Sequence, residues 1–429
     1  MRRNATLLFL LVFLTRVPFL GPGFGSDPDA WRIAGAARDI GRTGHYEASR
    51  FPGAPVVEIV DSLLLRLGER ALPIASALWG AIACAAFYVA LCRLGARGCF
   101  WAALALAFTP VFWIHTTDAM DYSWALGLAM LALAFAVYGR AVLAGTALGL
   151  AIGCRITTAV LILPIAILLE GRSYSRLVLS TILFGALALA PSFLTYGTRF
   201  LSGYEFGRVP WIYVIKGATR DVWGVIGSLA IAIALVIGLF RLRLAPRREL
   251  LAVVIAVALT GSIYFRLPHE GAYLLPAVPF VLLFLTRTLA KPGAVALACA
   301  MLASSILLGV SEVSTSADRH LSVEVRGSLL KECERRAEQL AARDALLKRA
   351  ASLPPNATVL VYEQLPLVEW AAPKGSPGFP EFVHLLPPAA LILAKEENRP
   401  VYATEQALDG EQKIYRVDAE KEWGVEKIP

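Results

Sequence analysis

Two aspartates, Asp27 and Asp29, lie two residues apart just after the first apolar segment, in the stretch Ser-Asp-Pro-Asp-Ala-Trp. Carboxylates in such a position could act as a general base, or could hold a metal ion or a hydroxyl group. The same residues could instead form a turn in which an aspartate caps the next helix. The local sequence leaves both interpretations open.

A second acidic pair, Asp118 and Asp121, lies at the end of a later apolar segment, beside His115. Asp121 directly precedes another apolar segment, so it could also serve only as a helix cap. If these acids face the same side of a membrane as Asp27, all of them could share one polar site. We therefore predict a second acidic site at Asp118 and Asp121.

Arg155 interrupts a long apolar run, where a charge without a partner is costly. It is expected either to bind an anion at the outer face or to pair with one of the acids. A later segment contains Arg266, His269, Glu270 and Tyr273. A lone histidine such as His269 is more often a surface residue than a catalytic one.

The composition defines the setting of these residues. The chain has 429 residues, of which 57% are hydrophobic and 17% charged, and its mean hydropathy is +0.61. An ordinary soluble domain is about 45–50% apolar and about 25% charged, so a soluble enzyme, a disordered chain and a coiled coil are excluded. The net charge of +8 lies largely in short loops between apolar runs. There it orients membrane helices, and we expect no nucleic-acid partner.

Apolar runs occupy most of residues 1–310. They span residues 5–20, 71–91, 99–114, 122–138, 141–169, 177–196, 222–240, 250–265, 273–285 and 293–310. The run 141–169 is ambiguous, because one helix would be about 43 Å long, against a hydrocarbon core of about 30 Å. Two helices broken near Arg155 would each be only about 21 Å long.

The basic loops decide between these alternatives. With the break, they all fall on one side: Arg2, Arg3, Arg93, Arg97, Arg140, Arg172, Arg176, Arg241, Arg243, Arg247, Arg248, Arg287 and Lys291. The positive-inside rule makes that side the cytoplasm. The sequence therefore predicts an all-α polytopic protein of the cytoplasmic (inner or plasma) membrane. It has about 11 transmembrane helices, an uncleaved first helix, a cytoplasmic amino terminus and an extracytoplasmic carboxyl terminus.

Three outer connections are long enough to carry structure: 21–70, 115–121 and 198–221. The first contains two helix-like stretches, 29–40 and 56–67. In 56–67, valines, leucines and an isoleucine oppose Glu58, Asp61 and Arg66. This pattern is typical of a helix that lies in the membrane interface.

The composition changes near residue 312, so we divide the chain into a membrane domain (1–311) and a small extracytoplasmic α/β domain (312–429). Helices are predicted at 326–351 and 387–398, and strands at 358–362, 401–404 and 413–417. No catalytic motif is evident in this region. We expect an accessory domain that aids acceptor binding or stability, without catalytic residues.

These features together resemble the GT-C class of integral-membrane glycosyltransferases. The chain is most similar to the protein O-mannosyltransferases, the lipid A aminoarabinose transferases and their relatives (family 39-type). The resemblance covers roughly residues 1–310 and rests on the order of short motifs. These are the acids after the first helix, residues 50–55 (Arg-Phe-Pro-Gly-Ala-Pro), 117–119, 149–157, and 273–276 with Pro279. Many members have adjacent Asp-Glu where this chain has Asp27-Pro28-Asp29.

The resemblance implies transfer of a sugar from a polyprenyl-phosphate donor to an acceptor hydroxyl on a protein, lipid or glycan. The reaction would take place at the extracytoplasmic face, among membrane lipids, with inversion at the anomeric carbon. Asp27 is the expected general base and Asp29 the alternative. Arg155, with Arg266 or Lys216, would bind the donor phosphate.

The remaining expected substrate-binding residues are Trp31, Arg50, His269, Glu270 and Tyr273. The resemblance covers metal-dependent and metal-free branches, and Asp27, Asp29 and Asp118 could hold a divalent metal.

Two other classes of function fit a polytopic protein. A secondary transporter would also have many helices, broken spans and intramembrane charge. The two halves of this chain show no repeat, however, and a large first loop with interfacial helices is unusual in a transporter. A non-catalytic membrane scaffold or sensor is the third alternative. The glycosyltransferase is the interpretation that the sequence favours.

Overall fold

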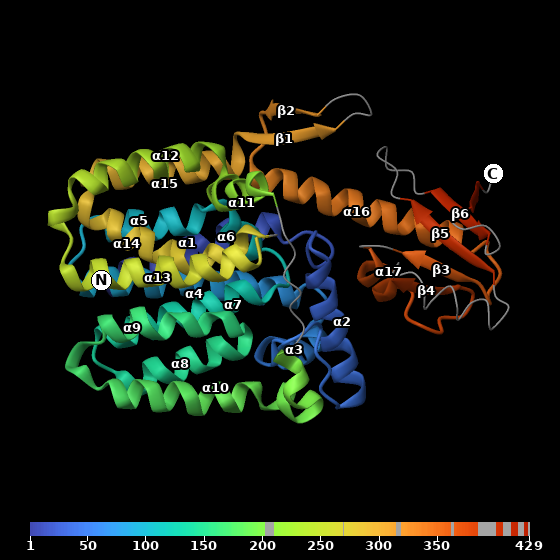
Figure 1. Ribbon diagram of the computed structural model, residues 1–429, viewed down its shortest axis with the longest axis horizontal. Helices are drawn as coiled ribbons and strands as arrows, with labels where there is room; N and C mark the ends of the chain where they lie inside the picture. Colours follow the sequence, from blue (N-terminus) through green and yellow to red (C-terminus); the bar gives the residue numbers. More distant parts are fainter. Residues whose placement is uncertain are drawn as a thin grey trace.

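The computed structural model describes residues 1–201, 210–268, 270–314, 319–361, 364–384, 400–405, 413–418 and 424–427. A bundle of helices makes up most of the molecule, and a smaller domain of strands and helices lies beyond one end of it (Figure 1). The fold class predicted from the sequence is thus confirmed.

The helices of the bundle include five that are long and apolar enough to cross a membrane, within the described residues. Two of them are α4 (Ala71–Arg93) and α13 (Arg247–Arg266). In the other three, neighbouring turns or a short helix lengthen the main helix: Tyr174–Leu201 contains α10 (Tyr174–Tyr196), Trp211–Phe240 contains α12 (Val222–Phe240), and Gly271–Thr288 contains α14 (Val278–Thr288). Shorter helices complete the bundle. These are α1 (Arg2–Arg16), α5 (Cys99–Phe108), α6 (Pro110–His115), α7 (Asp121–Val137), α8 (Ala141–Cys154), α9 (Ile162–Leu168), α11 (Trp211–Lys216) and α15 (Lys291–Ile306). The count of eleven spans stays a prediction.

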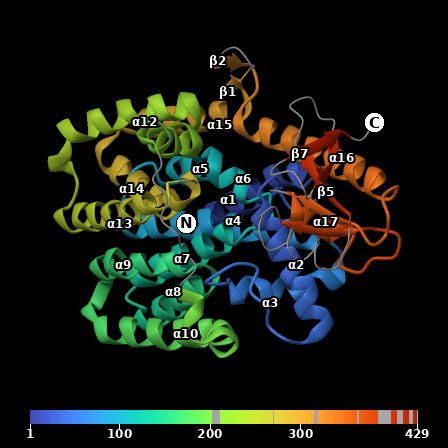
Figure 2. The same cartoon turned by 45° about the vertical axis from the view of Figure 1, so that its right-hand side comes forward.

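The predicted break at Arg155 is confirmed. Helix α8 ends at Cys154, Arg155 is extended (φ −153°, ψ 111°), and a 3-10 segment, Ile156–Leu161, leads into α9. Helices α8, α9 and α10 then lie side by side (Figures 1 and 2). A charged residue at the turn between two short apolar helices can reach polar partners at the end of the bundle, which a charge in the middle of one long helix could not.

The basic loops gather at one end of the bundle, as predicted. Arg93 forms an ion pair with Glu170 (2.6 Å), just beyond α9. Arg287 donates to the carbonyl of Leu94 (2.6 Å), and Arg248 donates to that of Leu169 (2.5 Å). These contacts join loops that are far apart in the sequence, and they place the basic residues at the end opposite Arg155.

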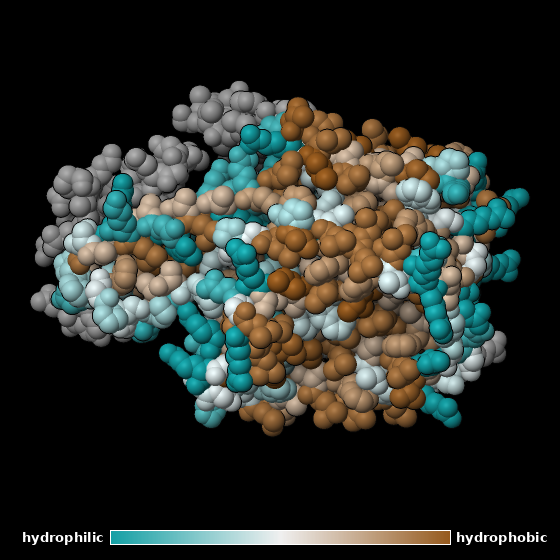
Figure 3. Space-filling view, turned by 180° about the vertical axis from the view of Figure 1, so that it is seen from behind, coloured by the Kyte–Doolittle hydropathy of each residue, from teal (hydrophilic) through white to brown (hydrophobic). Residues whose placement is uncertain are grey.

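A broad apolar surface covers the bundle between two polar ends (Figure 3). Large apolar side chains are exposed along three helices, for example Leu183 and Leu194 on α10, Leu229 on α12 and Val254 on α13. Exposed apolar surface of this extent is expected of helices that contact lipid hydrocarbon.

The predicted helices of the first outer connection are present as α2 (Pro28–Thr43) and α3 (Pro55–Leu64). In the second, the two acids opposed to the apolar residues do not face water, as they would on a helix that lies in the membrane interface. Glu58 and Asp61 are buried, whereas Ile59 and Leu63 are exposed. Glu58 turns inward because it accepts hydrogen bonds from Tyr46 and from backbone and hydroxyl groups of the 49–54 loop.

The C-terminal domain begins after α15 with a hairpin, β1 (Gly309–Ser314) and β2 (Arg319–Glu324), and continues into α16 (Ser328–Ala350). A five-stranded sheet follows in the order β4-β3-β5-β6-β7, with β3 parallel to both β4 and β5. Its elements are β3 (Thr358–Val361), α17 (Leu365–Ala371), β4 (Glu381–His384), β5 (Val401–Glu405), β6 (Lys413–Asp418) and β7 (Gly424–Lys427).

Helix α16 and strands β3, β5 and β6 match the predicted elements. Helix α17, strands β4 and β7 and the hairpin were not predicted. The predicted helix at 387–398 lies outside the described residues.

Candidate functional site

The polar residues singled out from the sequence meet at the end of the bundle opposite the basic loops. Helices α2 and α3 lie across this end, and the C-terminal domain is next to them (Figure 2). Side chains reach the site from the start of α2, the 44–54 loop, the end of α6, the start of α7, the end of α8 and the 3-10 segment η8 (Gly271–Ala277).

Asp27 is the N-cap of α2, and Pro28 is the first residue of the helix. Its Oδ1 accepts a hydrogen bond from the amide of Asp29 at 2.8 Å, so the capping interpretation is correct. Burial raises the pKa of Asp27 to about 7. The carboxylates of Glu270 and Asp29 add to this rise, and the Asp29 amide and Arg50 partly offset it. A carboxyl group with this pKa can both cap a helix and accept a proton near neutral pH.

Asp29 has different surroundings, although it is only two residues away. Its Oδ1 lies 2.7 Å from Nη1 of Arg32, and its Oδ2 lies 3.2 Å from Nε of Arg50. Burial acts to raise its pKa, but the two arginines outweigh burial and hold the pKa below its usual value. Asp29 is therefore a fixed carboxylate rather than a proton acceptor.

Arg50 joins α2 to α7. Its Nη2 lies 3.0 Å from Oδ2 of Asp121, while its Nη1 is buried and has no hydrogen-bond partner among the described residues. The loop that carries Arg50 turns at Gly53, whose φ of +87° favours glycine. A Cβ at Gly53 would also lie 2.7 Å from Oγ of Ser192, so the close packing of this loop requires glycine.

Arg155 pairs with Asp121 and still faces a cavity. Its Nη1 lies 2.8 Å from Oδ1 of Asp121, and its Nη2 donates to the hydroxyl of Tyr122 at 2.7 Å. The guanidinium also stacks over the rings of Tyr122 (3.7 Å) and Tyr273 (4.9 Å). A cavity of about 80 Å³ lies between Arg50 and Arg155, with Tyr273 in its lining. Both open alternatives for Arg155 thus receive support: it pairs with an acid, and it faces a cavity that could take an anion.

Tyr122 continues the network in the other direction. Its hydroxyl donates to Oε2 of Glu270 at 2.7 Å, and Oε1 of Glu270 lies 3.6 Å from Nε2 of His115. Nδ1 of His115 lies 2.9 Å from Oδ2 of Asp118. The other oxygen of Asp118 is buried without a hydrogen-bond partner in the described part of the chain.

The site therefore has two halves that meet at Tyr122. We use the name arginine half for Asp29, Arg50, Asp121 and Arg155, and the name acid half for Asp27, His115, Asp118 and Glu270. The predicted acidic site at Asp118 and Asp121 is divided between them. The bridging role of Tyr122 was not predicted, because a tyrosine at the start of an apolar helix is common at a membrane interface.

Other predicted residues lie around this network. Trp31 is only 2% exposed; its Nε1 donates to the carbonyl of Gly25 at 2.9 Å, and its ring packs against Phe24. Arg266 ends α13 and Lys216 ends α11, and neither lines the cavity between the two arginines. His269 lies outside the described residues.

The residues proposed for a divalent metal do not fit one. No three His, Cys, Asp or Glu side chains within the described residues lie where they could share an ion. Asp29 is occupied by two arginines and Asp118 by His115. A carboxylate that already pairs with two arginines, as Asp29 does, is a poor ligand for a hard cation.

The architecture is that of a polytopic membrane protein, and its fold matches those of two solved structures with the GT-C fold. The chain is similar to the crystal structure of ArnT from Cupriavidus metallidurans in the apo state, with a TM-score of 0.59 and 14% identity, covering 93% of this chain and 92% of ArnT. It is also similar to the oligosaccharyltransferase of Archaeoglobus fulgidus tethered with an acceptor peptide. There the TM-score is 0.51 and the identity 12%, and the match covers 94% of this chain and 69% of that one. No protein-family model matches the sequence, and no curated protein matches it.

Proposed function

We propose that this protein is a membrane glycosyltransferase that moves a sugar from a polyprenyl-phosphate donor to an acceptor hydroxyl at the extracytoplasmic face. The observation that carries the proposal is the juxtaposition, at one end of the bundle, of an anion-sized cavity between two arginines and an aspartate of raised pKa. The likeness to two GT-C structures supports it.

The arginine half suits the phosphate of the donor. Arg50 and Arg155 line one cavity, and Nη1 of Arg50 is a buried donor with no partner among the described residues. Guanidinium groups bind phosphate oxygens through parallel hydrogen bonds. As the bond from the anomeric carbon to the phosphate oxygen breaks, negative charge grows on the phosphate, and the two arginines stabilise it.

An apolar groove next to this cavity suits the lipid tail of the donor. It has a volume of about 510 Å³ and lies between α12, α13 and the η8–α14 segment. Leu274 lines the groove, and its neighbour Tyr273 lines the arginine cavity, so the tail and the phosphate can be bound at once. In the sequence, Arg266 follows the lining residue Phe265, and Lys216 lies two residues before the lining residue Ala218. They are the proposed first contacts of the phosphate as the donor enters.

Asp27 is the proposed general base. The acceptor hydroxyl oxygen attacks the anomeric carbon on the face opposite the phosphate, the carbon–phosphate-oxygen bond breaks with inversion, and the hydroxyl proton passes to the Asp27 carboxylate. Asp29 positions Arg50 and the start of α2. Glu270 keeps the proton affinity of Asp27 high, and no step requires a metal ion.

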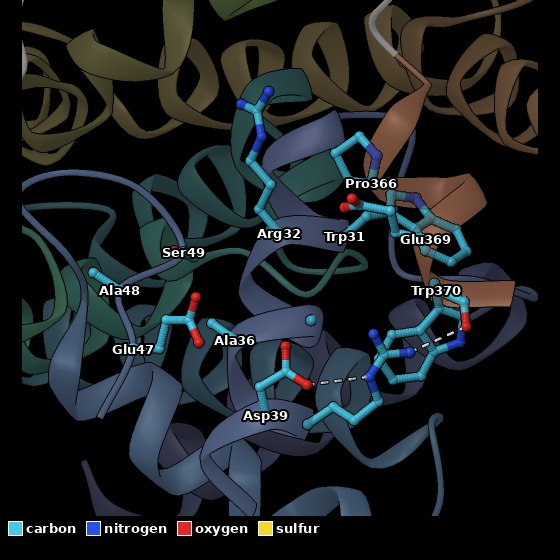
Figure 4. A pocket seen from close by; sticks show the side chains of 12 residues that line it. Trp31, Arg32, Ala36, Asp39, Glu47, Ala48, Ser49, Pro366, Glu369 and Trp370 are labelled. Carbon is cyan, nitrogen blue, oxygen red and sulfur yellow. Dashed lines mark hydrogen bonds and ion pairs between the residues drawn. The ribbon is translucent and has the colours of Figure 1, made fainter. Parts of the chain in front are cut away.

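A polar groove between α2, the 45–49 loop and α17 is the proposed path of the acceptor (Figure 4). Its volume is about 170 Å³, and Asp39, Glu47 and Glu369 lie around it, together with Trp370. Carboxylates accept hydrogen bonds from hydroxyl groups, and a tryptophan can stack on a sugar ring, so the groove suits a polyhydroxylated acceptor. Arg32 lines the groove and pairs with Asp29, which connects the groove to the arginine half.

The topology proposed with this function has the site outside the cytoplasm. A reporter that is active only in the cytoplasm, fused after Pro429, should then be silent. A reporter fused after Phe240, at the basic end of the bundle, is the matched positive control. A signal from the fusion after Pro429 would contradict the topology.

The function is tested with the purified full-length protein in lipid nanodiscs and polyprenyl-phosphate hexoses and pentoses as donors. The expected result is release of polyprenyl phosphate, accelerated by an acceptor glycan or glycolipid. Translocation of an intact sugar or lipid across sealed vesicles, without bond cleavage, would support the transporter alternative and overturn the proposal.

A further inference from the structure

Helix α16 of the C-terminal domain brings two buried charges to the site. Glu332 and Arg336 lie one helical turn apart and form an ion pair, with Nε of Arg336 2.9 Å from Oε1 of Glu332. Their exposures are only 9% and 5%. On an otherwise charged and partly exposed helix, both side chains of this pair are buried against the membrane domain.

Each member of the pair contacts a different loop of the acid half. Glu332 accepts hydrogen bonds from the amide (3.2 Å) and the hydroxyl (2.7 Å) of Ser26, the residue before Asp27. Arg336 donates to the carbonyl (2.9 Å) and the hydroxyl (3.2 Å) of Thr117, the residue before Asp118. One ion pair thus connects the backbone beside Asp27 to the backbone beside Asp118.

The two loops are packed against each other at the same place. The amide of Ala119 donates to the carbonyl of Phe24 at 2.6 Å. Gly25 has a φ of +149°, and a Cβ there would lie 2.9 Å from Cβ of Asp118, so only glycine allows this approach. The spacing between the loops is therefore fixed tightly, and a small change in α16 would move both.

We propose that Glu332 and Arg336 are positioning residues, which clamp the loop of Asp27 to the loop of Asp118 and so complete the active site from the C-terminal domain. This inference rests on the proposed function. A buried ion pair adds little net stability, because desolvation offsets the attraction between its charges. Its contacts with these two loops explain why it is here: it fixes the position of the base.

The clamp should affect the chemical step more than donor binding. The donor phosphate is assigned to the arginine half, which Glu332 and Arg336 do not contact in the described structure. A displacement of a catalytic group on the order of 1 Å can cost about 100-fold in rate. Loss of the clamp should therefore lower kcat and leave the KM for donor largely unchanged.

The first test compares Glu332→Gln with Glu334→Gln in the full-length protein. Glu334 lies on the same helix, but its ion pair with Arg326 is exposed, so its substitution is the matched control. Glu332→Gln should lower kcat about 10- to 100-fold with little change in the KM for donor, and Glu334→Gln should change neither. Ser26→Ala removes one hydrogen bond to Glu332 and leaves the ion pair intact, so it should lower kcat less. This variant replaces Glu332→Gln in the test if Glu332→Gln fails to fold.

The second test needs no substrate. Hydrogen exchange at the amides of Ser26 and Ala119 should be faster in Glu332→Gln than in the wild type or Glu334→Gln, because both loops lose their clamp. Unchanged exchange would overturn the proposal, and so would faster exchange with an unchanged kcat. If the wild type transfers no sugar, the proposed function fails, while the exchange result still decides whether the clamp exists.

Discussion

The arginine half and the acid half of the site are built from similar residues but balance their charges differently. In the arginine half, Asp29 pairs with Arg50 and with the neighbouring Arg32, and Asp121 pairs with Arg50 and Arg155. In the acid half, three carboxyl groups surround one histidine. No arginine or lysine of the described residues forms an ion pair with Asp27.

This difference separates two tasks within one network. The pKa of Asp29 is lowered and that of Asp27 is raised to about 7, although the two lie in one turn of chain. In the arginine half, the carboxylates are paired with arginines and one N–H donor has no partner among the described residues, which favours binding of an anion. In the acid half, carboxyl groups outnumber basic groups, which favours transfer of a proton. The environment of each aspartate, rather than its position after the first helix, assigns its role.

The substitution expected to have the largest effect is Asp27→Asn. Asparagine keeps the size and the helix cap but removes the proton acceptor, so the transfer rate should fall about 100- to 10,000-fold. The measurement is sugar transfer by purified protein at saturating donor. Asp344→Asn, at an exposed position on α16, is the control and should retain nearly full activity.

Asp29→Asn sharpens the comparison, because Asp29 is assigned to positioning. Its effect should be milder than that of Asp27→Asn in the same assay. If Asp29→Asn abolishes transfer and Asp27→Asn does not, Asp29 is the base. If both variants stay active, the mechanism is wrong.

Arg50→Lys tests the arginine half. Lysine keeps the charge but loses the planar fork that contacts two aspartates and the cavity, so the KM for donor should rise about 10- to 100-fold. Initial rates over a range of donor concentrations measure this change, with Arg42→Lys on the exposed end of α2 as the control. An unchanged KM would remove Arg50 from the phosphate site.

The pH dependence of the wild type follows from the raised pKa of Asp27. The base must be deprotonated, so kcat/KM should fall about tenfold per pH unit below about pH 7 and level off above it. A profile of transfer rate between pH 5 and 9 checks this. A rate that stays constant down to pH 5 would contradict a base with this pKa.

Glu270→Gln should have the smallest effect. It removes a like charge near Asp27 while keeping an acceptor for Tyr122, so the acidic limb should move to lower pH by about half a unit, or about threefold in rate at pH 6. The same pH series measures it. A shift to higher pH would show that Glu270 does not act on Asp27 through its charge.

Much of the fold could be predicted because a charged side chain is costly inside a membrane, so the charged residues mark the ends of the apolar helices. Arg155 marked the break in the run 141–169, and the basic loops marked one end of the bundle. The buried Glu58 and the Glu332–Arg336 pair could not be predicted, since acids on an amphipathic helix usually face water. Ser26 and Thr117, the partners of Glu332 and Arg336, are 306 and 219 residues away in the sequence. The partners of Glu58 lie in the irregular loop just before its helix, where no periodic pattern reveals them.

The central claim is that anion binding and proton transfer belong to different halves of the site. It is tested most directly by measuring the affinity of a polyprenyl-phosphate sugar for Asp27→Asn and Arg50→Lys in nanodiscs by calorimetry. Asp27→Asn should bind the donor as tightly as the wild type while transferring almost no sugar, and Arg50→Lys should bind it about 10- to 100-fold more weakly. If Asp27→Asn loses donor affinity as strongly as it loses activity, then donor binding and proton transfer do not belong to separate halves of the site, and the central claim is contradicted.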